Sequence, residues 1–173
     1  LINDNTGIFK RPFKFLDIGC GNGWVVQKAS TIKNCILAEG IDGAPQMIKK
    51  ARDKDSGNTY YLEDIEIWEP EEKYNIIFSM EVFYYFKDPG KIISKFSKYL
   101  EDGGLMIIGL DHYKENIQSL NWDKEYNIST NTFSIQGWKD FFIKAYLEDV
   151  VSIQYGAKGK WEGTLIVLGN KKT

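Results

Sequence analysis

Three glycines at alternate positions, Gly19, Gly21 and Gly23, follow an apolar stretch that contains Asp17. Glycine tolerates a positive φ and has no side chain, so a ligand can lie directly against the backbone and the N-terminus of a following helix. A tight turn between a strand and a helix needs one glycine, not three. The spacing therefore predicts a loop that binds a nucleotide-like ligand.

The spacing of the glycines also indicates which class of nucleotide the loop could bind. A dinucleotide-binding loop has the pattern Gly-x-Gly-x-x-Gly, whose third glycine lets the helix pack closely on the strand. Trp24 occupies the position of that third glycine, which disfavours NAD. No Lys-Ser or Lys-Thr pair follows the loop, so a phosphate-binding loop of the Walker type is excluded as well.

Asp42 is the second residue of chemical interest. A carboxylate about 20 residues beyond such a glycine loop is expected to bind the hydroxyls of a ribose, and Asp42 stands at this distance. Glu39 is a rival, but it lies inside the predicted strand, and ligands of open α/β sheets bind at the C-terminal ends of strands. An Asp before Gly43 is also typical of a solvated turn. The distance of Asp42 from the glycine loop nevertheless favours a role in binding the ribose.

The elements that must position these residues alternate in type. Short apolar runs alternate with segments of helical periodicity, which indicates an α/β domain with a parallel sheet. Predicted strands span residues 13–18, 35–41, 59–62, 74–80, 105–110, 150–155 and 164–168. Predicted helices span 23–31, a stretch beginning at Pro45, a stretch from Asp88-Pro89 to Gly103-Gly104, and 135–146. We therefore expect a Rossmann-like three-layer sandwich: a mostly parallel seven-stranded sheet with a C-terminal antiparallel hairpin.

Length and composition limit the possible functions. Residues 1–173 suit one globular domain, and the net charge of -2 argues against a nucleic-acid-binding surface. Cys20 and Cys35 lack metal-ligand spacing, so we expect reduced thiols and no metal site. No apolar run is long enough to cross a membrane, and no signal peptide opens the chain, which favours a cytoplasmic protein without a membrane partner.

Three segments together resemble a known family. Residues 16–23, 40–47 and 60–64 look like the class I S-adenosylmethionine-dependent methyltransferases, and within them the small-molecule group called methyltransferase type 11. The resemblance covers residues 13–110 and implies a Rossmann-like fold, S-adenosylmethionine as cofactor and a methyl acceptor that is a small molecule. The closing helix and hairpin fit the end of the family's sheet.

The resemblance also implies roles for individual residues. The residues that it places around the cofactor are Asp17, Gly19, Cys20, Gly21, Gly23, Asp42, Gly43, Met47, Asp64, Ile65, Met80 and Glu81. Asp17 would bind the amino group of the methionine part, Asp42 the ribose and Asp64 the adenine amino group. Met47 and Ile65 would lie near the adenine ring, and Met80 and Glu81 near the methionine end.

Methyl transfer from a sulfonium requires mainly alignment of donor and acceptor, and a general base is needed only if the acceptor must lose a proton. The family usually has a histidine after the stretch that corresponds to residues 81–86, and this chain has none there. The candidate bases are His112, Asp111 and Glu81, at the predicted ends of strands. His112 titrates in the right pH range but also suits an exposed loop.

The segment 113–133 is polar and aromatic without clear periodicity, and it follows a strand end that faces the predicted cofactor site. We expect it to form an acceptor pocket or a lid, although its aromatic residues also suit the packed underside of a surface loop. Two other interpretations stay open. The domain could bind the cofactor without turnover and act through a partner, or it could methylate a protein or an RNA.

Overall fold

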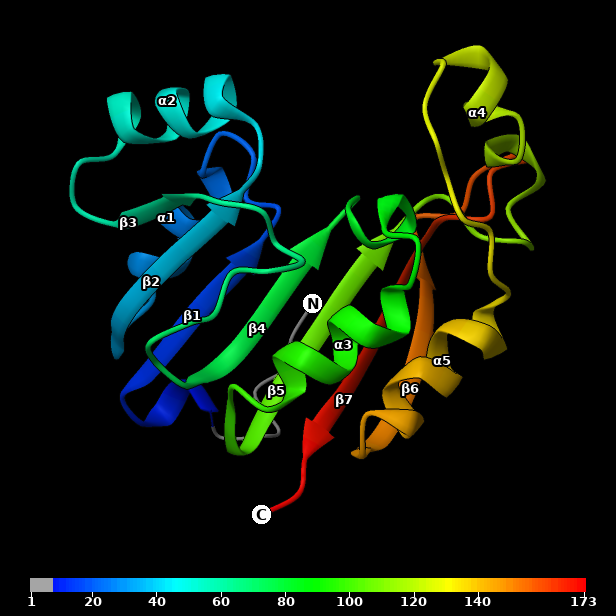
Figure 1. The fold of residues 1–173 in the computed structure, drawn as a ribbon. Coiled ribbons are helices and arrows are strands. Elements are labelled where there is room, and N and C mark those ends of the chain that lie inside the picture. The colour runs from blue at the N-terminus through cyan, green and yellow to red at the C-terminus, as the bar shows by residue number, and fades with distance from the viewer. Residues whose placement is uncertain (1–7) are drawn as a thin grey trace.

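The computed structural model describes residues 8–173, and seven strands within this range form one sheet of order β3-β2-β1-β4-β5-β7-β6 (Figure 1). The strands are β1 Phe13–Ile18, β2 Cys35–Asp42, β3 Thr59–Leu62, β4 Tyr74–Met80, β5 Leu100–Leu110, β6 Leu147–Tyr155 and β7 Thr164–Lys171. The first five are parallel, and β7 pairs antiparallel with both β5 and β6. The predicted fold class is confirmed. The part of the predicted domain before residue 8 lies outside the described residues.

Five helices accompany the sheet: α1 Trp24–Ser30, α2 Pro45–Lys54, α3 Pro89–Ser97, α4 Trp122–Glu125 and α5 Ile135–Lys144. Local sequence explains where two of them begin. Asp88 accepts a hydrogen bond from the Lys91 amide at 3.0 Å, and Ser134 accepts one from the Gly137 amide at 3.1 Å. Each side chain thereby satisfies a backbone N–H that the first turn of the helix leaves free.

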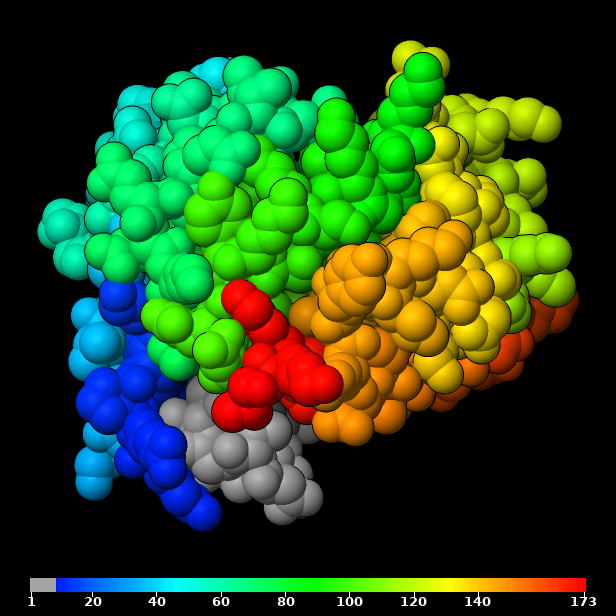
Figure 2. Space-filling view, turned by 60° about the horizontal axis from the view of Figure 1, so that its bottom comes forward, coloured from blue at the N-terminus to red at the C-terminus, as the bar shows by residue number. Residues whose placement is uncertain are grey.

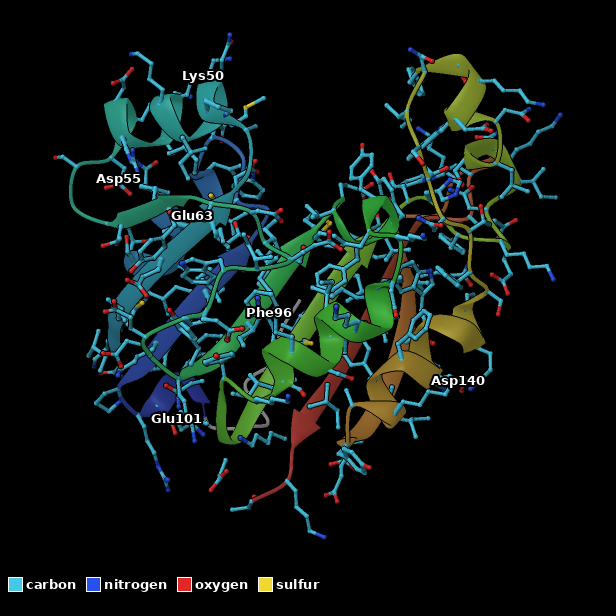
Figure 3. All side chains as sticks on the ribbon, viewed as in Figure 1. Lys50, Asp55, Glu63, Phe96, Glu101 and Asp140 are labelled. Atoms are coloured by element: carbon cyan, nitrogen blue, oxygen red, sulfur yellow. The ribbon has the colours of Figure 1, made fainter. Side chains whose placement is uncertain are left out.

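The helices cover the two faces of the sheet unequally. On one face α3 and α5 bury a large core that includes Phe96, Trp138 and Phe142. On the other face α1 contributes Val26 and Ala29 to a smaller core under β1 and β2. Figure 3 labels Phe96 beside α3, which lies in front of the sheet in this view. The order of strands reverses between β1 and β4, which is where open α/β sheets bind ligands.

The prediction that Gly103-Gly104 ends a helix is wrong. Helix α3 ends at Ser97, and β5 begins at Leu100, which pairs with Tyr74 of β4. The chain then loops out, because the pairing resumes only at Leu105 and Gly103 has a φ of +72°. The two glycines thus serve an irregularity within the strand. The two glycines do indicate a turn, as predicted, but this turn lies within β5 and not at the end of α3.

The edge strand β6 is also irregular. It begins at Leu147, three residues earlier than the predicted start at residue 150, and its pairing with β7 shifts between Glu148 and Val151. Asp149 has a φ of +51° at this point. Among residues 8–173, no helix has the length and apolar character needed to cross a membrane.

Candidate functional site

The glycine loop joins β1 to α1 and is shaped by close contacts on two sides. Gly19 has a φ of +74°, and a Cβ there would come within 2.2 Å of Val82. Gly23 has a φ of +77°, and a Cβ there would come within 2.5 Å of the Tyr60 ring. Both positions therefore require glycine. Gly23 caps α1, and its carbonyl accepts a hydrogen bond from the Tyr60 hydroxyl, so it has a structural role here, and the cofactor contact that the resemblance implies stays a prediction.

Asp42 connects the glycine loop to the start of α2. Its Oδ2 accepts a hydrogen bond from the Gly21 amide at 2.9 Å, and its Oδ1 accepts one from the Ala44 amide at 2.8 Å. A Cβ at Gly21 would meet nothing within 4 Å, so this side of the loop faces open space. The rival Glu39 is buried and accepts hydrogen bonds from Tyr61 and Tyr74. Asp42 alone lies at the mouth of the loop.

A cavity of about 340 Å³ opens beside this loop. It is lined by Asp17, Gly19, Cys20, Gly21, Asn22, Trp24, Val25, Met47, Met80 and Glu81. Seven of the predicted cofactor residues are in this lining, and Asn22, Trp24 and Val25 were missed. Trp24 is 63% exposed, so its ring lies over the cavity and is not packed under the helix.

A second cavity, of about 580 Å³, lies on the other side of Asp42. Its lining consists of Gly43, Pro45, Leu62, Glu63, Asp64, Ile65 and Phe86. It contains the three predicted residues Gly43, Asp64 and Ile65, and Phe86 was missed. One oxygen of Asp64 accepts the Glu66 amide at 2.8 Å, and Ile65 is buried. Figure 3 shows Glu63, which follows β3, below α2.

Asp17 gives the first cavity its electrostatic character. The residue is only 2% exposed, and none of the hydrogen bonds among residues 8–173 reaches its carboxylate. Burial, together with the nearby charge of Asp42, raises the pKa of Asp17 to about 8. A buried carboxylate in this condition favours a cationic partner. The amino group of a bound amino-acid moiety would supply one, which fits the methionine part of S-adenosylmethionine.

Glu81 and Asp111 follow neighbouring strands and form a second acidic group. Met80 of β4 pairs with Gly109 of β5, and the Glu81 amide donates to the Gly109 carbonyl at 2.9 Å. Burial, together with the charge of Asp111, raises the pKa of Glu81 to about 7. The Tyr84 hydroxyl donates to Glu81 Oε2 at 3.1 Å. Glu81 lines the cavity, so its carboxylate can accept a proton there near neutral pH.

His112 is placed differently from the prediction. It is 1% exposed, its Nδ1 lies 2.9 Å from the Ser119 carbonyl, and its Nε2 lies 2.8 Å from the Thr132 hydroxyl. The carbonyl can only accept, so Nδ1 carries the proton and Nε2 accepts from Thr132. Burial lowers the pKa of His112, which keeps the ring neutral. Both ring nitrogens have hydrogen-bond partners within this segment, and the role of His112 as general base stays a prediction.

The segment 113–133 is anchored over the end of β4 and β5. Besides the bonds of His112, the Asn131 amide donates to the Tyr84 carbonyl at 2.8 Å, and its side chain donates to the Phe86 carbonyl at 2.9 Å. Figure 1 shows α4 of this segment above the sheet, on the opposite side from α2. The segment is thus attached to the turn that carries Tyr84.

Two other cavities differ from these in their lining. One, of about 440 Å³, is lined by Lys98, Lys144, Lys171 and Lys172 together with five other residues. Figure 2 looks toward that end of the molecule, where the C-terminal residues (red) lie between the start of β5 (green) and the α5–β6 region (orange). The other, of about 340 Å³, is an apolar depression on the sheet that includes Phe78 and Ile153. No described group of three or more His, Cys, Asp or Glu could hold a metal ion.

The strand order, the glycine loop after β1, the acidic residue after β2 and the paired cavities define the class of S-adenosylmethionine-dependent methyltransferases. The chain belongs to the family described as methyltransferase domain, whose model matches residues 1–150. The cofactor of this class is S-adenosylmethionine. The predicted family and cofactor are confirmed.

Curated relatives are similar at moderate identity. Malonyl-[acyl-carrier protein] O-methyltransferase 2 of Ilyobacter polytropus is 30% identical over 149 residues, which are 79% of this chain and 57% of that protein. Trans-aconitate 2-methyltransferase of Agrobacterium fabrum is 25% identical over 134 residues, or 77% of this chain and 49% of that protein. The chain thus spans about half the length of these relatives.

Solved structures show the same fold. A Haloferax volcanii methyltransferase in complex with the Trm112 methyltransferase activator has a TM-score of 0.81 at 23% identity, covering 94% of this chain and 83% of that one. The N-methyltransferase NodS of Bradyrhizobium japonicum, in complex with S-adenosyl-L-homocysteine, has a TM-score of 0.68 at 18% identity, covering 97% and 83%.

Proposed function

We propose that this domain transfers a methyl group from S-adenosylmethionine to a small-molecule acceptor. The observation that carries the proposal is the pair of cavities on either side of Asp42, one lined by the glycine loop and Asp17, the other by Asp64 and Ile65. Together they suit a ligand with a charged amino-acid end, a central ribose and a planar base. The bound cofactor supplies an activated methyl group on a sulfonium.

Individual residues of the chain are proposed to bind the cofactor and to orient its reacting end. Asp17 is proposed to pair with the amino group of the cofactor. Asp42 holds the loop amide of Gly21 at 2.9 Å and keeps the loop in the shape that receives the ribose. Met47, which is 40% exposed and lines the loop cavity, closes one side of it. Met80 and Glu81, which line the same cavity, are proposed to face the reacting end of the cofactor. Rate enhancement then comes mainly from alignment and from exclusion of water.

The segment 113–133 is proposed to be the lid of the acceptor pocket. This interpretation rests on its anchoring through His112 and Asn131 to residues that adjoin Glu81. The relatives named for malonyl-[acyl-carrier protein] and trans-aconitate support a small or carrier-bound acceptor, and one structural neighbour is named as an N-methyltransferase. These names differ in the atom that receives the methyl group.

Calorimetric titration tests the proposal. S-adenosylmethionine and S-adenosylhomocysteine should bind with micromolar affinity, and NAD should not. Asp42→Ala should weaken binding at least about tenfold because the loop loses the carboxylate that orders it. Asp53→Ala is the matched control, since Asp53 is exposed on α2 and only pairs with Lys49. Absence of binding by folded protein, or equal binding by both variants, would refute the proposed site.

A further inference from the structure

The acidic group beyond the reacting end of the cavity is not neutralised by the rest of the site. Within the described range, no Lys or Arg forms an ion pair with Glu81 or Asp111. Asp111 Oδ1 is buried without any hydrogen-bond partner. A buried, unpartnered carboxylate oxygen is costly unless a ligand satisfies it.

Aromatic rings continue from this acidic group toward solvent. Tyr84, whose hydroxyl contacts Glu81, lies 4.5 Å from Tyr85 and 6.2 Å from Trp122 between ring centroids. Trp122 lies 6.2 Å from Tyr126. Tyr84 is buried, whereas Tyr85 and Tyr126 are exposed. The rings thus form a connected wall from the surface to the carboxylates, on the turn after β4 and on α4.

Given the proposed function, we propose that the methyl acceptor is an amine, bound as its cation between the carboxylates of Glu81 and Asp111 and the wall of Tyr84, Tyr85 and Trp122. An ammonium group would satisfy the free oxygen of Asp111 and neutralise the acidic pair. Aromatic faces attract cations within about 6 Å of the ring centroid. A carboxylate acceptor would add like charge to the same place, which is strongly unfavourable away from water.

A divalent cation is a weaker candidate for the same position. The described residues bring no third His, Cys, Asp or Glu into a metal-binding group with these two carboxylates. Hard divalent cations prefer six or more oxygen ligands. An ammonium group needs only two or three acceptors and gains from the aromatic rings as well.

The chemistry balances with the groups present. The bound R–NH₃⁺ gives a proton to the carboxylate of Glu81, which leaves the nitrogen with a free electron pair. A bond then forms between nitrogen and the methyl carbon while the carbon–sulfur bond breaks, and its electron pair stays on sulfur. The products are the methylated ammonium and the neutral thioether. Glu81 returns its proton to water at the mouth of the cavity.

Paired probes that share a phenylethyl group and differ in the charge of the attached group test the inference. Protein saturated with S-adenosylhomocysteine is titrated with 2-phenylethylamine and with 3-phenylpropionate, followed by calorimetry and by the fluorescence of the tryptophans. The amine should bind at least about tenfold more tightly than the carboxylate. Asp111→Asn should abolish this preference while leaving the affinity for S-adenosylhomocysteine unchanged. Asp102→Asn, an exposed change at the opposite end of the sheet, should leave both unchanged.

The outcomes separate the two proposals. If S-adenosylhomocysteine does not bind, the proposed function fails. If it binds but the amine does not, or if the carboxylate binds equally well, the methyltransferase proposal stands and the amine proposal is overturned. Mass spectrometry with S-adenosylmethionine and a panel of aryl-alkyl amines and matched carboxylates gives the second readout. Methyl transfer to carboxylates and to none of the amines also overturns the amine proposal.

Discussion

At the scale of single residues, Asp17 has opposite effects on cofactor binding, which it is proposed to favour, and on the stability of the fold, which it lowers. Its carboxylate lines the cavity, is almost wholly buried, and has a pKa raised from 3.8 to about 8, first by burial and then by Asp42. The unfolded chain therefore ionises Asp17 at a lower pH than the folded chain does. Stability is lost as pH rises from about 4 to about 8, because folding then buries a charge.

Asp17→Asn should consequently stabilise the free protein and weaken its binding of the cofactor. At pH 8 we expect a gain of about 1–2 kcal/mol in the free energy of unfolding, shrinking toward pH 5. Affinity for S-adenosylhomocysteine should fall at least about tenfold, because its amino group loses the carboxylate. Urea unfolding at pH 5 and 8 and calorimetry measure the two effects. Destabilisation at pH 8 by this variant, with Asp102→Asn as the control, would contradict the argument.

At the scale of elements, His112 fixes the segment 113–133, the proposed lid, to the sheet. Both ring nitrogens are used by the segment 113–133, through the Ser119 carbonyl and the Thr132 hydroxyl. The lid is therefore held at its start and at its end by one side chain. This arrangement makes the position of the acceptor wall depend on a residue that does not reach the cavity itself.

Thr132→Val should loosen the lid without disturbing the cofactor. The change removes the hydroxyl that donates to His112 and costs about 1 kcal/mol of stability. Limited proteolysis should become faster within 113–133, and kcat/KM for the acceptor should fall several-fold while affinity for S-adenosylhomocysteine stays constant. Thr59→Val, at an exposed position in β3, is the matched control. An unchanged proteolysis rate would show that the hydrogen bond does not hold the lid.

The elements and the loop could be predicted because their signals are local. Apolar runs, helix caps and the glycine spacing depend on neighbours in the sequence, and Asp17, Gly21 and Met80 line the cavity as expected. Trp24 and Phe86 were not predicted as lining residues, because an aromatic residue in the sequence is equally typical of the hydrophobic core. The burial of His112 could not be predicted, because its partners, Ser119 and Thr132, lie in an irregular segment without periodicity.

At the scale of the whole molecule, a buried carboxylate connects three strands across the sheet. Glu39 of β2 accepts the Tyr61 hydroxyl of β3 at 2.8 Å and the Tyr74 hydroxyl of β4 at 2.6 Å, although β1 lies between β2 and β4. The sequence presented Glu39 as a rival ribose-binding residue. Its two phenol partners show that this acidic residue, three positions before Asp42, stabilises the sheet and does not face the cofactor site.

Tyr74→Phe should lower the stability of the folded protein and leave the cofactor site unchanged. One oxygen of Glu39 would lose its donor in a buried place, which costs about 1–3 kcal/mol. Urea denaturation should show the loss, and affinity for S-adenosylhomocysteine should remain unchanged. Tyr155→Phe, at an exposed position of β6, should change stability by less than about 0.5 kcal/mol. Equal stability of the two variants would show that Tyr74 contributes only its ring.

The irregularity in β6 has a consequence for how the chain behaves in concentrated solution. This strand ends the sheet, and its exposed face carries Val151, Ile153 and Tyr155. A flat strand of this composition would invite a second sheet to add to its edge and start aggregation. The shift at Asp149 bends the strand, and Glu148 and Asp149 place two negative charges at the bend. The bulge thus limits polymerisation, so straightening it should lower solubility before it lowers stability.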